Sequence, residues 1–174
     1  IVTGGGKGLD KTLARFLQEA GMSVAICGRT ENTIVETVKQ FEVTFPGKIY
    51  GQVCNVASSS DVVDFVANAK RTYGELHVLI NNSGFGKETL IWETSEKAWD
   101  EVMDTNVKGT FLMCKEVVPH MVNSKEGYII NIASQAALNG YANAGVYCAS
   151  KFAMVGLGKA LQEEVRPYGI HVHS

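Results

Sequence analysis

Short apolar runs alternate with amphipathic patterns along this 174-residue sequence, and the alternation restricts the fold more than any other feature. Six runs have the composition of buried strands, at residues 1–3, 23–27, 49–56, 76–84, 128–134 and 170–174. Strands that are apolar on both faces and separated by helices are typical of a parallel sheet covered by helices on both sides. Because crossovers between parallel strands are right-handed, we predict a Rossmann-type, doubly wound α/β fold.

The segments between these runs carry apolar residues at helical spacing. In the first segment, Leu13, Phe16, Leu17 and Ala20 form the predicted buried face, and Gly21 ends the helix. Further helices are expected around residues 34–41, 62–69 (capped by a serine among 58–60), 95–124 (bent at Pro119) and 146–169.

Composition and charge limit the classes of function. A net charge of −2 leaves no basic excess for nucleic acid or for an anionic membrane surface. No apolar run approaches the roughly 18–20 residues of a membrane span, and no charged-then-apolar leader precedes the first strand. The sequence therefore predicts one cytoplasmic domain over residues 1–174 that acts on a small molecule.

Cysteines and histidines give no metal or disulfide pattern. The cysteines are scattered, form no CxxC pair and are expected to be small buried thiols. They are Cys27, Cys54, Cys114 and Cys148. The histidines share no ligand spacing with carboxylates, so we expect no metal site. They are His77, His120, His171 and His173.

Both ends of the sequence have the character of strand interiors. The chain begins within IVT and stops within IHVHS, without polar, irregular termini. We therefore expect it to be part of a longer chain, with a final strand and a substrate-capping segment outside it.

A glycine-rich turn, TGGGKGLD from Thr3 to Asp10, joins the first strand to the first helix. Such turns hold a phosphate through backbone N–H groups and the positive end of the helix, although a tight turn without a ligand has the same composition. The carboxylate of Asp10 stands where a phosphate would approach. We expect it to weaken the binding of a diphosphate unless the side chain turns to solvent.

The end of the second strand bears on the choice of dinucleotide. NAD sites carry an acidic residue there for the ribose 2′-hydroxyl, whereas GRT places Arg29 at this position and no acid before Glu31. A guanidinium suits a 2′-phosphate, and Lys7 adds a second cation. The pattern predicts NADP(H) over NAD(H), with a solvated arginine as the alternative.

The sequence YCASK places Tyr147 and Lys151 four residues apart, on one face of a helix. A free tyrosine has a pKa near 10, and an ammonium close to it favours the phenolate and makes it a better proton shuttle at neutral pH. Ser134, at the end of the fifth predicted strand, is placed to hold a substrate oxygen against the phenol. A surface YxxxK arises often by chance, but these features together indicate a proton-transfer site.

These motifs, in this order and spacing, resemble those of the short-chain dehydrogenase/reductase family over the whole chain. The TGxxxGxG turn of the family corresponds to residues 3–10, with Asp10 in place of the last glycine, and its NNAG motif corresponds to NNSG at 81–84. Its catalytic asparagine and serine match Asn106 and Ser134, and its YxxxK motif matches residues 147–151.

The resemblance implies hydride transfer between a nicotinamide and a carbonyl or secondary alcohol. Tyr147 would be the general acid or base, Lys151 would hold the nicotinamide ribose, and Ser134 would polarise the substrate oxygen. Asn106 would interrupt its helix and anchor a water, while Asn55 replaces the family's aspartate at the adenine. The residues predicted to hold the cofactor are Thr3, Gly4, Gly6, Lys7, Gly8, Leu9, Arg29, Asn55, Val56, Asn82, Ser83, Gly84, Tyr147 and Lys151.

The resemblance also implies size and assembly. Members of the family typically have about 250 residues, near the upper size of a single domain. About a quarter of such a chain would therefore lie outside this sequence. A homodimer or homotetramer is expected through the two long helices around the fifth strand, and small residues line the second of them, at Ala149, Ala153, Gly156, Gly158 and Ala160. Trp92 and Trp99 flank the start of a helix near the expected site and are expected to pack in the core, with the lining of a substrate cleft as the alternative for one of them.

Two other functions stay open at this point. One is an NAD-dependent alcohol dehydrogenase of the same family. The other is a non-catalytic cofactor-binding or scaffold protein, an alternative prompted by Asp10 and opposed by the joint presence of Asn106, Ser134, Tyr147 and Lys151.

Overall fold

The computed structural model describes residues 1–4, 6 and 8–174 and contains one six-stranded parallel sheet in the order β3-β2-β1-β4-β5-β6. The strands are β1 (Val2–Thr3), β2 (Val24–Gly28), β3 (Ile49–Val53), β4 (Val78–Asn81), β5 (Gly127–Asn131) and β6 (Ile170–His173). The helices are α1 (Gly8–Glu19), α2 (Glu31–Thr44), α3 (Ser59–Tyr73), α4 (Glu96–Met103), α5 (Gly109–Ser124) and α6 (Gly145–Val165). The predicted doubly wound α/β fold is confirmed.

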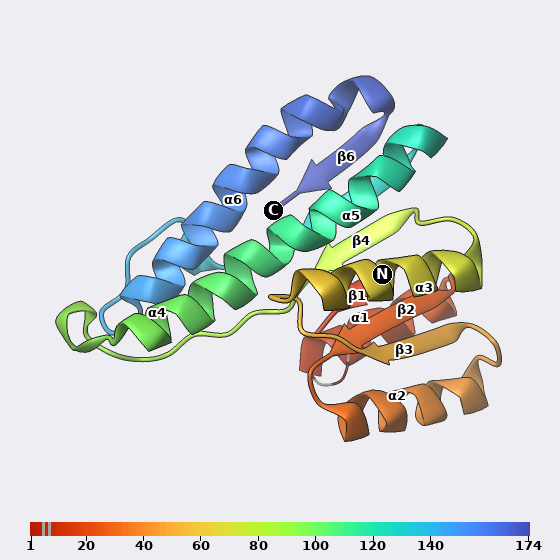
Figure 1. Ribbon diagram of the computed structural model, residues 1–174, viewed down its shortest axis with the longest axis horizontal. Helices are drawn as coiled ribbons and strands as arrows, with labels where there is room; N and C mark the ends of the chain where they lie inside the picture. Colours follow the sequence, from red (N-terminus) through yellow and green to blue (C-terminus); the bar gives the residue numbers. More distant parts are fainter. Residues whose placement is uncertain (5, 7) are drawn as a thin grey trace.

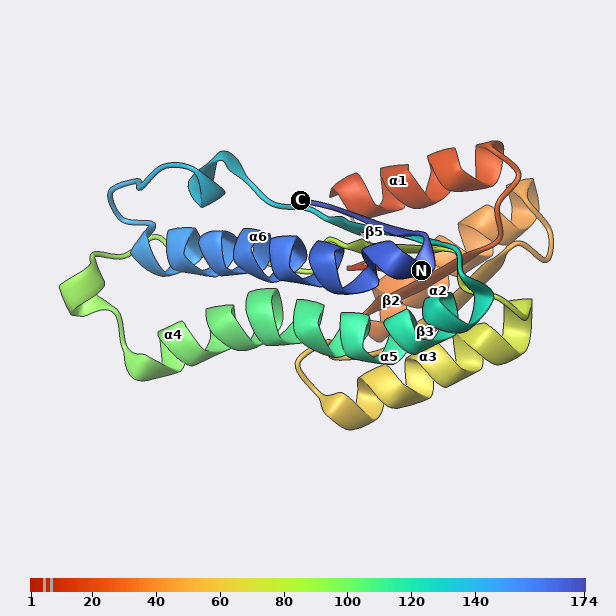
Figure 2. The same cartoon turned by 90° about the horizontal axis from the view of Figure 1, so that it is seen from above.

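Helices cover both faces of the sheet. Figures 1 and 2 show α3, α5 and α6 on one face and α1 on the other, where α2 also packs. The first core contains fully buried Phe65, Met113 and Ile129, and the second contains Val2, Ala14 and Ile26. The two cores explain why the strands carry apolar side chains on both faces.

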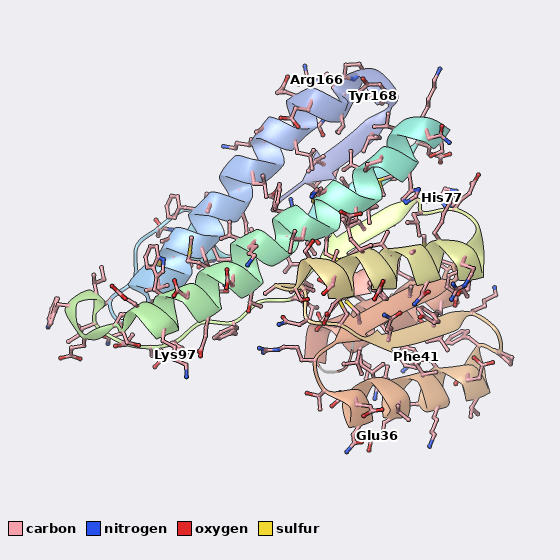
Figure 3. All side chains as sticks on the ribbon, in the orientation of Figure 1. Glu36, Phe41, His77, Lys97, Arg166 and Tyr168 are labelled. Atoms are coloured by element: carbon pink, nitrogen blue, oxygen red, sulfur yellow. The ribbon has the colours of Figure 1, made fainter. Side chains whose placement is uncertain are left out.

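Local signals set most of the helix ends. The Ser58 hydroxyl accepts the N–H of Asp61 at 3.4 Å and caps α3, as predicted, and Gly74 ends this helix with a φ of +80°. In α2, Phe41 faces the sheet and is buried, whereas Glu36 points to solvent (Figure 3). The prediction for α1 was wrong at Phe16, which is 62% exposed, and at Ala20, which is exposed just beyond the end of the helix, because Ala14 and Gln18 form the buried face instead.

The long helical stretch before β5 is continuous but not uniform. Between α4 and α5 the backbone forms a π-helical turn at Asp104–Lys108, with Asn106 at its centre, while α5 continues past Pro119 to Ser124. The departure from α-helical geometry thus falls at Asn106, the residue that the family resemblance identifies as catalytic. Single π-helical turns within α-helices are frequent at functional sites.

The order of the strands determines where a ligand can enter. The chain runs from β1 outward to β3 and then returns to β4 on the other side of β1, so the crossovers diverge between β1 and β4. Ligands of doubly wound sheets bind at such a point, outside the carboxyl ends of the strands. In the part of the chain that the structure describes, no helix is long and apolar enough to cross a membrane.

Candidate active site

A cleft of about 820 Å³, open solvent included, lies at the carboxyl ends of β1, β2, β3 and β4. Its lining combines the glycine turn, the start of α2, the segment after β3 and the loop after β4, and consists of Gly4, Gly6, Asp10, Gly28, Arg29, Thr30, Thr33, Ile34, Cys54, Asn55, Val56, Asn82, Ser83, Gly84, Phe85 and Thr105. Eight of the predicted cofactor residues are in this set. The cleft therefore has the position and the lining of a dinucleotide site.

The glycine turn has the backbone that only glycine adopts readily. Gly4 has a φ of +91° and Gly8 a φ of +56°, and a Cβ at Gly4 would lie 2.5 Å from Asp10 Oδ2. Gly8 and Leu9 begin α1 outside the cleft lining, and Leu9 is 55% exposed. Lys7 lies outside the described residues. The turn fits a phosphate cradle in its backbone, but the Asp10 carboxylate occupies its inner side.

Asp10 is buried rather than turned to solvent. The residue is only 9% exposed, Oδ2 faces Gly4, and buried Oδ1 has no hydrogen-bond partner among the described residues. Loss of solvation raises the pKa of this carboxyl from 3.8 to about 6. The site thus carries a carboxyl group that is held in a place where its charged form is disfavoured.

We expect Asp10→Asn to raise the free energy of unfolding of the ligand-free protein at pH 7. A carboxyl whose pKa is raised on folding binds its proton more tightly in the folded state, so stability falls as pH rises from about 4 to about 6. The gain at pH 7 should be about 1–2 kcal/mol, since the α1 macrodipole offsets part of the cost of the charge. Urea unfolding at pH 4 and pH 7 measures it, and a less stable variant at pH 7 would contradict the burial of an ionised Asp10.

Arg29 extends from the end of β2 along the cleft. The side chain is exposed, and its guanidinium carbon lies 5.9 Å from the centre of the Phe85 ring, across the cleft mouth. Thr30, which precedes α2, makes no capping hydrogen bond with its side chain. The cleft therefore ends beside a cation and the N-terminus of α2, two features that attract an anion.

Thr3 has a different place from the one predicted. It is 1% exposed, and its Oγ1 accepts the N–H groups of Asn82 and Ser83 at 3.1 and 3.0 Å. It lies behind the cleft rather than in its lining. The hydroxyl of Thr3 therefore ties β1 to the loop after β4, and Thr3 positions that loop.

Asn55 lies in the cleft lining with its side chain exposed. Its Oδ1 accepts the N–H of Ala57 at 3.1 Å, and its own N–H donates to Asp61 Oδ2 at 3.0 Å. The segment after β3 is thus ordered by side chains at the start of α3. The amide NH₂ and one lone pair of Oδ1 remain for a ligand.

Asn106 holds the loop after β4 from below. It is fully buried, its Oδ1 accepts the N–H of Phe85 at 3.0 Å, and its Nδ2 donates to the Phe85 carbonyl at 2.9 Å. The same Nδ2 donates to Ser150 Oγ at 2.9 Å, and Ser150 Oγ donates to the Tyr147 carbonyl at 2.7 Å. A π-turn residue thereby connects the loop to the first turn of α6.

Ser150 is a residue that the sequence reasoning missed. It is fully buried between Asn106 and the backbone of Tyr147. Its spacing of three from Tyr147 places it on the same side of the helix, which was the available signal. Its partner in the π-turn, 44 positions away, was not predictable from spacing.

Tyr147 and Lys151 lie on the same side of α6, with the Lys151 Nζ 5.7 Å from the centre of the tyrosine ring. Lys151 is 4% exposed, and its Nζ donates to the Ile132 carbonyl at 2.7 Å. Burial lowers the pKa of the Lys151 ammonium. The ammonium is therefore held in one position between α6 and the segment that leaves β5.

Glycines of the loop after β4 connect this pair to the cleft. A Cβ on Gly84 would lie 3.0 Å from Asn106 Oδ1 and 3.6 Å from Lys151 Nζ. A Cβ on Gly86 would lie 3.0–3.2 Å from atoms of the Tyr147 side chain. Because Gly84 also lines the cleft, the cleft leads to Lys151 and Tyr147.

Ser134 follows two residues after the carbonyl that binds Lys151. Its Oγ accepts the N–H of Ala136 at 3.2 Å and caps the 3-10 turn Gln135–Ala137, which packs against α6. The hydroxyl keeps its own proton for donation to a ligand. The structure thus links Asn106 to the Tyr147 backbone through Ser150, holds Lys151 Nζ 5.7 Å from the tyrosine ring, and places Ser134 at the start of a 3-10 turn that packs against α6.

The prediction that Trp92 and Trp99 pack in the core was wrong. Trp92 is 80% exposed and Trp99 is 45% exposed. The cysteines that the structure describes are free and buried, as expected. Among the described residues, no three His, Cys, Asp or Glu side chains gather in a way that would hold a metal ion.

The family model of the short chain dehydrogenases matches residues 1–174 of this chain. The chain belongs to this family. It is 32% identical to the 3-oxoacyl-acyl-carrier-protein reductase of Staphylococcus epidermidis, over all of this chain and 71% of that protein. It is thus a short-chain dehydrogenase/reductase, and the predicted family is confirmed.

Two solved structures have the same fold as this chain. One is a variant of the actinorhodin polyketide ketoreductase, solved with NADPH, with a TM-score of 0.94 and 34% identity. The other is a xylitol dehydrogenase bound to NAD⁺, with a TM-score of 0.94 and 27% identity. Each alignment covers 98% of this chain and 66% of the solved chain.

Proposed function

We propose that this short-chain dehydrogenase/reductase transfers a hydride between NADP(H) and a carbonyl or secondary alcohol, in the reductive direction. The observation that carries the proposal is the cluster of Asn106, Ser150, Tyr147 and Lys151, which meets the dinucleotide-type cleft at Gly84. When bound, the nicotinamide supplies the hydride. The residues of this chain provide the proton and the geometry.

Tyr147 is the general acid for reduction. Its side chain lies against Gly86, two residues beyond Gly84 of the cleft lining, and its phenol would donate the proton to a substrate oxygen. The buried Lys151 ammonium is fixed by the Ile132 carbonyl and favours the phenolate that forms when the proton leaves. Lys151 Nζ has two further protons for the ribose hydroxyls of the cofactor.

Ser134 and Asn106 complete the arrangement. Ser134 keeps a hydroxyl proton for the substrate oxygen and thereby orients the carbonyl toward Tyr147. Asn106 uses its side chain to fix the Phe85 backbone and Ser150, and the water that would pass protons to Lys151 is what the family resemblance implies for this residue. This division of roles follows the family resemblance and agrees with the contacts in this chain.

The choice of NADP(H) rests on Arg29. Its guanidinium and the uncapped start of α2 form a positive end to the cleft, suited to a 2′-phosphate. A solved ketoreductase of similar fold binds NADPH, and a metagenomic short-chain oxidoreductase with a TM-score of 0.93 and 28% identity is in complex with NADP. An NAD⁺-bound relative has the same fold, so the fold alone does not decide the cofactor.

We expect Arg29→Ala to raise the KM for NADPH by about 10–100-fold and to leave the KM for NADH nearly unchanged. The basis is the loss of a charge-assisted contact worth about 1.5–3 kcal/mol. Arg166→Ala is the matched control, because Arg166 is an exposed arginine at the far end of α6 (Figure 3). An unchanged KM for NADPH in Arg29→Ala would favour the NAD-dependent alternative.

The activity itself is tested with the purified protein, NADPH and a panel of ketones and β-keto esters, by the loss of NADPH fluorescence. We expect saturable NADPH binding and consumption with at least one carbonyl compound. Saturable binding without turnover on any compound would favour the non-catalytic alternative, and the absence of saturable binding would reject the cofactor.

We further propose that the enzyme is a homo-oligomer in a reducing compartment, the cytoplasm. Phe111 on α5 and Phe152 on α6 are 47% and 48% exposed, on two helices that lie side by side. Exposed aromatic side chains on adjacent helices support a subunit contact. The four free, buried cysteines support a reducing environment.

A further inference from the structure

The Asp10 carboxyl lines the cofactor cleft, yet the proposed reaction does not use it. Among the residues that the structure describes, one of its oxygens is buried without a hydrogen-bond partner, and the other faces Gly4 at the start of the glycine turn. An ionised oxygen in such a place has lost water without gaining a donor, which is costly. A protonated carboxyl avoids the cost and also becomes a hydrogen-bond donor.

The glycine turn and the N-terminus of α1 are where a doubly wound fold receives the diphosphate of a dinucleotide. Asp10 belongs to the first turn of α1 and is part of the cleft lining. An ionised Asp10 would repel the diphosphate at short range. The neutral acid would instead donate a charge-assisted hydrogen bond, which is among the stronger kinds.

We propose that Asp10 binds the dinucleotide as the neutral acid, donating its proton to a diphosphate oxygen, so that cofactor binding takes up one proton from solvent. This inference rests on the proposed function, because it assumes that the cleft binds NADP(H). It makes Asp10 a cofactor-binding residue whose contribution depends on pH.

Other charged and titratable groups face the same cleft. Arg29 from β2 and the buried thiol of Cys54 line it, and Tyr147 and Lys151 lie beyond Gly84 on the side of α6. Lys7 belongs to the same turn but lies outside the described residues. A cation near the turn favours the ionised form of Asp10, whereas a bound diphosphate favours its neutral form. The protonation state of Asp10 therefore depends on whether the cofactor is bound.

Burial prepares the free protein for this proton. The pKa of Asp10 is already raised to about 6 without any ligand, and the negative diphosphate raises it further. Above pH 6 the free protein must first take up the proton, so affinity falls as the pH rises. Asp10→Asn keeps a hydrogen-bond donor of similar shape but has no titrating proton. The variant therefore separates the pH dependence of NADPH binding at Asp10 from the effect of filling the same buried space.

The experiment is titration calorimetry of the intact protein with NADPH at pH 6, 7 and 8, in two buffers of different ionisation enthalpy at each pH. Between pH 6 and pH 8, we expect the dissociation constant for NADPH to rise roughly 50-fold more in the wild type than in Asp10→Asn. At pH 7 the wild type should take up nearly one proton more per bound NADPH than the variant. The comparison cancels the titration of the 2′-phosphate, which is common to both.

Asp64→Asn is the control, since Asp64 is exposed on α3 and its substitution makes the same change in charge. It should behave as the wild type. Equal pH slopes and equal proton counts in wild type and Asp10→Asn would overturn the inference and show that Asp10 stays ionised in the complex. Absence of saturable NADPH binding in every variant at every pH would instead reject the proposed cofactor, which is a distinguishable result.

Discussion

Replacement of Tyr147 by phenylalanine is expected to lower kcat for carbonyl reduction by a factor of about 10²–10⁴, the usual contribution of a positioned general acid. The phenyl ring keeps its packing against Gly86, and the Lys151 ammonium keeps its hydrogen bond to the Ile132 carbonyl. Only the proton donor is removed. NADPH affinity, measured by fluorescence titration, should therefore change by less than about threefold.

Tyr168→Phe is the matched control for this prediction. Tyr168 is 44% exposed in the 3-10 turn that follows α6, far along the helix from Tyr147 (Figure 3), and its variant should retain wild-type kcat. A Tyr147→Phe enzyme with kcat within a few-fold of wild type would show that another group delivers the proton. A parallel loss of NADPH binding would show that the hydroxyl also holds the cofactor, so that the fall in kcat would not measure proton transfer alone.

Asn106→Ala is expected to lower the free energy of unfolding by about 2–4 kcal/mol. The substitution removes three hydrogen bonds at a fully buried position: the N–H and the carbonyl of Phe85 lose their side-chain partner, and Ser150 Oγ loses a donor while it keeps its bond to the Tyr147 carbonyl. Urea unfolding at neutral pH measures the loss. The loop over Lys151 should also loosen, so kcat should fall even where the variant remains folded.

Asn123→Ala provides the comparison within the same helical stretch. Asn123 is exposed near the end of α5, and its replacement should change stability by less than about 0.5 kcal/mol. If Asn106→Ala were as stable as Asn123→Ala, the hydrogen bonds from Asn106 to the backbone of Phe85 would contribute nothing to the stability of the fold. If it were unstable but fully active at low temperature, Asn106 would hold the structure without serving the reaction.

The elements of the fold could be predicted because their signals are local. Alternating apolar runs, the serine before α3 and the glycine after it act over a few residues, and the structure has them where expected. The errors have local causes as well. Phe16 satisfies helical spacing but lies on the exposed side of α1, because spacing gives a face and leaves open which neighbouring face the sheet covers.

The candidate site could be predicted in part. Arg29, Asn55 and the NNSG loop line the cleft, since parallel strands bring their carboxyl ends together. Thr3 does not, because its hydroxyl is used by the backbone of Asn82 and Ser83, 79 and 80 positions away. Trp92 and Trp99 are exposed although large aromatic residues favour burial, because they lie in and after a loop that extends from the body of the sheet.

The sequence by itself determined the order of strands and helices, the position of the glycine turn and the pairing of Tyr147 with Lys151. These follow from backbone geometry and from hydrophobic periodicity, which repeat every few residues. Only the tertiary structure decided that Asp10 is buried against Gly4 and that Asn106 binds both Phe85 and Ser150. Burial and hydrogen bonding depend on partners that the chain brings together from distant positions, and these partners set the charge that Asp10 carries and the place that Tyr147 holds.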